Sequence, residues 1–149
     1  MKQQIKTVLP TLRAPKGYHF KVERSGKYHT YIRLFDSTKM QVGYISLVKL
    51  NYNDTEKRWA THSYLRYDLH GKGLGALLYS KAIEWGLKHG YKIRSSGASS
   101  DMAQRVWKGK SLRQYFSIRH RANKIHSAGT WYAYPKKATC KKSAPKNKR

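Results

Sequence analysis

Three glycines stand where the chain passes from a strand-like pattern to a helix-like one. Gly71, Gly73 and Gly75 alternate with other residues, and a run without glycine or proline follows. The first N–H groups of a helix have no partner within it and lie at the positive end of its dipole. Glycine allows an anion to approach that backbone without meeting a Cβ. The pattern predicts a phosphate-binding loop, with a tight turn that binds nothing as the alternative.

Two common phosphate motifs do not fit these residues. A nucleoside-triphosphate loop needs the string GxxxxGK[ST], which the chain lacks. The dinucleotide fingerprint is matched in form by Gly71, Gly73 and Ala76, but it needs an acid about 20 residues further on. Lys92 and Arg94 stand near that place instead. Another ligand, a phosphate group of nucleic acid, stays open on the residues alone.

The elements around the loop predict a mixed α+β domain. Before it, stretches rich in Tyr, Val, Ile and Thr are divided by turn-forming clusters, which favours an antiparallel meander. After it, apolar residues recur with helical spacing from Leu74 to Trp85, and Gly90 suits the end of that helix. Residues 111–126 are basic and fit no single element. We expect strands over 18–24, 27–35, 40–52, 58–65, 91–96 and 130–134, with helices over 74–89 and 101–108.

The segment LRYDLHGKGLGALLYSKAIEWGLKHGY, residues 65–91, resembles the acetyl-CoA-binding segment of the GCN5-related N-acetyltransferases, the GNAT superfamily. The resemblance rests on the loop from His70 to Gly75, the helix that follows, the next strand and a second helix. It implies a mostly antiparallel sheet with a central glycine-loop helix. Only a turn separates the first two strands, so the helices that the family places there are expected to be reduced or absent.

The resemblance also implies a reaction and a cofactor. The expected activity is transfer of an acetyl group from acetyl-CoA to an amine, on a macromolecular or polyanion-associated acceptor. The strands 58–65 and 91–96 would splay to open a slot for the pantetheine arm, which would pair with the strand end, while the loop amides would hold the pyrophosphate. The cofactor-binding residues implied are Leu65, Arg66, Tyr67, His70, Gly71, Lys72, Gly73, Leu74 and Gly75.

Catalytic residues are less evident. Trp107 stands where the family often has a tyrosine that protonates the leaving thiolate, and an indole cannot serve as that acid. Tyr115 is the expected substitute. Glu56 and His62 are the candidate general bases, because a carboxylate and an imidazole can each remove a proton from an amine. The alternative for His62 is an ordinary strand histidine.

The charge of the chain indicates its partners. Lys and Arg number 32 against seven acids, a net charge of +25. Without residues 135–149, 25 Lys and Arg remain against the same seven acids, a net charge of +18. Nucleic acid or an acidic protein is therefore an expected partner, and a GNAT-like module that binds nucleic acid without transferase activity is the alternative function. The basic residues assigned to that alternative are Arg105, Lys108, Lys110, Arg113, Arg119, Arg121 and Lys124.

Composition limits the class of protein further. The single cysteine, Cys140, excludes an internal disulfide and a multi-thiolate metal site, which favours a reducing cytoplasm, and no metal is expected. The chain has no apolar run of about 18 residues, so no membrane span is expected. We expect an N-terminal extension over 1–17, one GNAT-like domain over 18–134 and a disordered basic tail over 135–149.

Overall fold

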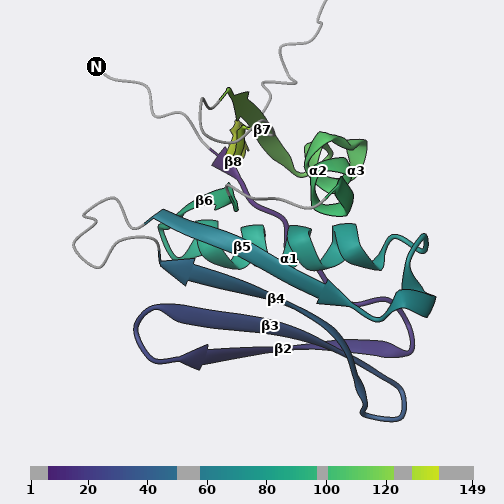
Figure 1. The fold of residues 1–149 in the computed structure, drawn as a ribbon. Coiled ribbons are helices and arrows are strands. Elements are labelled where there is room, and N and C mark those ends of the chain that lie inside the picture. Colours follow the sequence, from purple (N-terminus) through teal and green to yellow (C-terminus); the bar gives the residue numbers. More distant parts are fainter. Residues whose placement is uncertain (1–6, 50–57, 97–100, 123–128, 138–149) are drawn as a thin grey trace, which may run out of the picture.

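The computed structural model describes residues 7–49, 58–96, 101–122 and 129–137. Figure 1 shows the long helix α1 lying along a twisted sheet, with α2 and α3 gathered near β7. The helices are α1 (Leu74–Lys88), α2 (Asp101–Lys108), α3 (Lys110–Arg113) and the short 3₁₀ helix η1 (Tyr67–Leu69). The strands are β1 (Thr7–Val8), β2 (Tyr18–Ser25), β3 (His29–Asp36), β4 (Gln41–Lys49), β5 (Arg58–Leu65), β6 (Lys92–Ser95), β7 (Phe116–Arg121) and β8 (Thr130–Lys137).

The described strands form one sheet in the order β1-β8-β6-β5-β4-β3-β2, and β7 also pairs with β8. The pair β5–β6 is parallel, because α1 connects these strands, and the other described pairs are antiparallel. Residues 26–28 alone join β2 to β3, so no helix lies between them. The predicted α+β class and the mostly antiparallel sheet are confirmed. The basic stretch 111–126, which fitted no element, contains β7 and most of α3.

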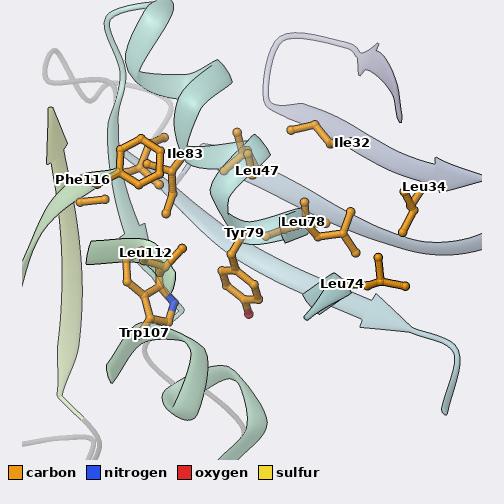
Figure 2. Packing of buried hydrophobic residues seen from close by; sticks show 14 of the residues in the cluster. Ile32, Leu34, Leu47, Leu74, Leu78, Tyr79, Ile83, Trp107, Leu112 and Phe116 are labelled. Atoms are coloured by element: carbon orange, nitrogen blue, oxygen red, sulfur yellow. The ribbon is translucent and has the colours of Figure 1, made fainter. Parts of the chain in front are cut away.

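The core lies between α1 and one face of the sheet. Apolar side chains of α1 meet those of β3 and β4, and on the other side those of α2, α3 and β7 (Figure 2). The labelled members of this cluster are Ile32, Leu34, Leu47, Leu74, Leu78, Tyr79, Ile83, Trp107, Leu112 and Phe116. Gly86 lets α1 come close to β6, because a Cβ at this position would collide with the side chain of Ile93. This contact fixes the distance between α1 and β6.

The segment before β2 is attached to the domain. The backbone N–H of Leu12 donates to Glu84 Oε1 at 2.8 Å, and Lys81 Nζ donates to the Leu12 carbonyl at 2.9 Å. Glu84 is 4% exposed, and Lys88 also pairs with its carboxylate, at 3.3 Å. Strand β1 lies in the expected N-terminal extension, and β8 continues to Lys137, beyond the expected domain end at 134.

Two classes of feature are absent from the described residues. None of the described helices has the length and apolar character needed to cross a membrane. The same residues contain no group of three or more His, Cys, Asp or Glu side chains arranged to hold a metal ion.

Candidate active site

The strands β5 and β6 separate at one end. They pair over four positions, from Arg58 with Lys92 to Thr61 with Ser95. Beyond that last pair β6 ends, while β5 continues to Leu65, and no described strand pairs with it on this side. We call this point the fork. It is the opening that the sequence predicted between these two strands.

The ladder between β4 and β5 determines which backbone groups of β5 point toward the fork. The N–H of Arg66 donates to the Val42 carbonyl at 2.8 Å, at the end of the β4–β5 ladder. Because hydrogen-bonded and non-bonded pairs alternate in an antiparallel ladder, the backbone groups of Ser63 and Leu65 point away from β4 and toward the fork. The Leu65 carbonyl is engaged there by His70 Nε2 at 2.8 Å.

A groove runs from the fork to the glycine loop. It consists of two adjoining cavities of about 350 and 270 Å³, which share Leu65, His70, Gly75 and Met102. The cavity at the fork is also lined by Ser63, Tyr64, Tyr67, Leu78 and Ala103, and the cavity at the loop by Gly71, Gly73, Ala76, Arg105 and Val106. We call the two together the α1 groove. It brings together β5, the loop, α1 and α2.

The loop exposes backbone N–H groups at one end of this groove. Gly71 and Gly73 both have φ +81°, a left-handed conformation that favours glycine. Gly73 caps α1, and the first helical hydrogen bond runs from the Leu77 N–H to the Gly73 carbonyl at 3.1 Å. The N–H groups of residues 74–76 therefore have no acceptor within the helix. No acidic side chain lies in this first turn, so the end of the helix stays electropositive.

A buried tyrosine hydroxyl lies next to Ser63, which lines the cavity at the fork, although the tyrosine itself lines neither cavity. Tyr79 projects from α1 toward β5, and its hydroxyl is 3.0 Å from Ser63 Oγ. Burial raises the pKa of the Tyr79 phenol, although the hydrogen bond with Ser63 and the nearby Thr61 hydroxyl partly oppose the shift. The phenol therefore keeps its proton at neutral pH. The sequence analysis missed Tyr79 because this residue lies among apolar residues of a helix that is covered on two sides.

The comparisons with known proteins agree with this geometry. Residues 7–108 match the model of the acetyltransferase (GNAT) family. The chain belongs to the GNAT family. This match confirms the resemblance found in residues 65–91. No curated protein sequence matches the chain significantly.

Solved GNAT structures share the fold at low sequence identity. The GNAT protein YhbS of Escherichia coli, in complex with CoA, has a TM-score of 0.55 and 11% identity, over 87% of this chain and 85% of YhbS. A GNAT protein from Kribbella flavida has a TM-score of 0.52 and 14% identity, over 78% of this chain and 71% of its own.

A spermidine N-acetyltransferase SpeG chimera of Vibrio cholerae and hSSAT has a TM-score of 0.51 and 15% identity. The match covers 72% of this chain and 66% of the chimera, so this chain spans just under two thirds of that protein. At these identities the likeness shows the fold.

The predicted catalytic residues of this GNAT protein lie apart from one another. His62 is exposed on the face of β5 opposite Ser63, since neighbouring strand residues alternate between faces. Tyr115 follows α3, packs against the core and does not line either cavity of the groove. Trp107 is fully buried and makes an edge contact with Tyr79, with ring centroids 6.0 Å apart. Glu56 lies outside the described residues.

The basic residues that the sequence grouped are also divided. Arg105 lines the α1 groove, whereas Arg119 and Arg121 lie on β7 and line a different cavity. Arg113 turns inward and donates to the carbonyls of Trp107, Lys108 and Gly109 at 2.6–3.1 Å. Lys108 and Lys110 are exposed on α2 and α3, and Lys124 lies outside the described residues. They do not form one surface.

Proposed function

We propose that this GNAT protein is an N-acetyltransferase that binds acetyl-CoA in the α1 groove. The observation that carries the proposal is the continuity of this groove, from the loop N–H groups to the fork between β5 and β6. Acetyl-CoA would supply an acetyl group activated as a thioester. The chain would supply binding, orientation and proton transfer.

The groove suits the chemistry of CoA. The N–H groups of residues 74–76 offer donors to a pyrophosphate, and Arg105 adds a cation beside them. Positive φ at Gly71 and Gly73 turns the loop without placing a Cβ against the ligand. The backbone edge of Ser63 and Leu65 offers pantetheine amides a strand-like partner. The Arg66 N–H is already bonded to β4 and the Leu65 carbonyl to His70, so the Ser63 backbone and the Leu65 N–H are better placed for this role than Arg66 and Tyr67.

Tyr79 is the proposed proton donor. Its hydroxyl lies beside Ser63 at the fork, and burial keeps it protonated. As the amine attacks the thioester carbonyl and the carbon–sulfur bond breaks, Tyr79 Oη would give its proton to the departing sulfur. Ser63 would orient the hydroxyl through their 3.0 Å contact. Tyr79 would thus supply a phenol at the fork, although Trp107 stands where the resemblance implies the catalytic tyrosine of the second helix.

The acceptor amine would approach from the face of the sheet opposite α1. His62 lies on that face and is the described candidate for proton removal, with Glu56 as the other candidate. The net charge of +25 disfavours a free polyamine, because like charges repel the encounter. An amine on a macromolecule that is anionic, or bound to a polyanion, is favoured.

One observation favours the alternative of a GNAT-like module without transferase activity. Trp107, at 0% exposed, fills the position where the resemblance implies a catalytic tyrosine. The two functions differ in what they require of the α1 groove. A module that only binds nucleic acid needs neither a CoA slot nor a proton donor at the fork.

Calorimetric titration with acetyl-CoA at about 150 mM salt tests the cofactor, because screening weakens nonspecific phosphate binding at that ionic strength. ATP is the control, since it has adenine and phosphates but no pantetheine. We expect micromolar binding of acetyl-CoA and much weaker binding of ATP. Equal, weak binding of both would reduce the loop to a simple phosphate site and contradict the proposal.

The proton donor is tested by Tyr79→Phe with Tyr115→Phe as the matched control. Release of free thiol from acetyl-CoA is followed with lysine peptides, spermidine and amine-bearing oligonucleotides as acceptors. We expect Tyr79→Phe to lower kcat about 100-fold with little change in KM, a typical loss for a general acid. Tyr115→Phe is expected to leave kcat unchanged. The opposite pattern would assign the donor to Tyr115.

A further inference from the structure

A second cavity lies between β6, β8 and β7, away from the α1 groove. Its volume is about 300 Å³, near the lower limit for ligand pockets, and none of its lining residues is acidic. Its polar side chains are four cations and two tyrosines, with His120 at one side. We call this the Arg–Tyr cavity; the six residues are Lys92, Arg94, Arg119, Arg121, Tyr132 and Tyr134.

Strand register places these six residues on one face of the sheet. Tyr132 of β8 pairs with Arg94 of β6 on one side and with Arg119 of β7 on the other. The remaining residues are two positions away along each strand and so share that face. The opposite face has the row of Ile93, Ala133 and Ile118, which packs in the core beneath α1. The Arg–Tyr cavity therefore opens on the face opposite α1.

The three arginines of the cavity have no acidic partner among the described residues. Within the described part of the chain, no carboxylate pairs with Arg94, Arg119 or Arg121. The buried Nε of Arg94 has no hydrogen-bond partner among the described residues. Several cations around one cavity repel one another, and a buried donor without a partner adds a further cost. An anionic ligand would offset both costs.

The tyrosines indicate which anion fits. The guanidinium carbon of Arg119 lies 5.5 Å from the ring centre of Tyr134, a residue that is 40% exposed. Arginines beside exposed aromatic rings suit phosphates next to unstacked bases, and an acidic peptide would make no use of the ring faces. The bases of a duplex are stacked inside the helix and cannot reach the rings.

Aromatic side chains continue across the same face. Tyr64 of β5, which is 53% exposed, lies 5.9 Å from Tyr44 of β4, and Tyr44 lies 6.1 Å from Tyr31 of β3. Arg33 lies over the ring of Tyr31 at 4.6 Å. From β3 to β7 the face spans six strands, roughly 24 Å at the usual strand spacing. This is enough for several nucleotides.

From these contacts we propose that the sheet face opposite α1 binds single-stranded nucleic acid, with the Arg–Tyr cavity as its main anchor. The Arg and Lys side chains contact phosphates, and Tyr132 and Tyr134 stack on bases. The site differs from the cluster predicted over residues 105–124, since it includes Lys92 and Arg94 of β6 and does not include Arg105 or Arg113. It does not depend on acyl transfer in the α1 groove.

The test is fluorescence anisotropy of the full chain with labelled RNA and DNA single strands of about 12 nucleotides, over a range of salt concentrations. The variant Arg94→Gln with Arg119→Gln removes two cavity charges. The control, Lys108→Gln with Lys110→Gln, removes two exposed charges elsewhere. We expect the cavity variant to lose at least tenfold in affinity and about 1.4 in the slope of log K against log salt. The control is expected to lose less than about threefold.

Three results would overturn the proposal. Equal losses of oligonucleotide affinity in the two double variants would show that binding depends on the overall positive charge of the chain and not on the cavity. Polyglutamate bound as tightly as the oligonucleotide would indicate an acidic-peptide surface, and a duplex bound as tightly would exclude recognition of unstacked bases.

If the double cavity variant melts at a lower temperature than the original chain, photocrosslinking of a bromouridine oligonucleotide to the unmodified chain decides the question. Crosslinks at Tyr132 or Tyr134 support the site, and crosslinks confined to other regions contradict it.

Discussion

The two anion sites that we propose lie on opposite faces of the sheet and differ in their chemistry. On the α1 side, the groove is lined mainly by apolar side chains and glycine, and the proposed anion site is the exposed backbone at residues 74–76. On the opposite face, the Arg–Tyr cavity presents four cationic side chains and no acid. Backbone N–H donors are fixed in number and direction, whereas Lys and Arg side chains can change conformation and attract an anion over a longer distance.

This difference predicts different ligand behaviour. An anion held by a helix terminus and a shaped groove is selected by its shape, and its affinity changes little with salt. An anion held by several Lys and Arg side chains is selected by charge density, and its affinity falls steeply as salt rises. Both faces include β6. A substitution therefore tests one proposed site alone only if the side chain that it changes lies on that face.

The largest expected effect is a loss of acetyl-CoA affinity caused by a substitution in the glycine loop, with oligonucleotide affinity unchanged. Gly73→Asp places a carboxylate beside the exposed N–H groups, and Gly73→Asn is the matched control, because both residues tolerate the left-handed conformation. We expect Asp to weaken acetyl-CoA binding about 100-fold or more, since a like charge against a phosphate is costly. Asn should weaken it only a few-fold, and neither should change oligonucleotide binding. Similar losses for Asp and Asn would mean that charge at this position is irrelevant.

A second, smaller effect is a loss of stability from a substitution that disturbs the packing of α1 on β6. Gly86→Ala drives a methyl group into Ile93 of β6 and is expected to lower the free energy of unfolding by about 1–3 kcal/mol. Gly75→Ala is the control, because its Cβ would meet only Leu65 Cδ2, at 3.9 Å, and alanine favours a helix. Urea unfolding of both variants measures the difference. Equal stabilities would show that α1 does not rest on β6 as closely as described.

The α1 side was predictable from sequence because its signals are local. The glycine loop, the start of α1 and the strand before it lie within residues 58–88, so the residue pattern predicted this strand, loop and helix in the right order. The role of Tyr79 was not predictable, because its position beside Ser63 depends on where β6 ends. A tyrosine in an apolar helix looks like a core residue until the fork is known.

The opposite face was less predictable because its residues come together through strand order. Arg94 and Arg119 both flank Tyr132 only because β8 inserts between β6 and β7. Sequence proximity instead grouped Arg113 with Arg119, although Arg113 turns toward the backbone carbonyls at the end of α2. Clusters of like charge in a basic chain therefore suggest a kind of partner, and the sheet register shows which of the charged side chains share a face.

The smallest expected effect tests the buried state of Tyr79 without any ligand. Burial raises its pKa in the folded chain above the ordinary value of 10.0. The unfolded chain therefore loses this proton at a lower pH than the folded chain, so the stability linked to Tyr79 is full below about pH 10 and falls as pH rises beyond it. Tyr79→Phe removes this dependence. In urea unfolding at about pH 8 and pH 10.5, the original chain should lose more stability than the Phe variant. Equal losses would mean that the hydroxyl ionises as freely in the fold as in the unfolded chain, and would remove the basis for Tyr79 as a proton donor.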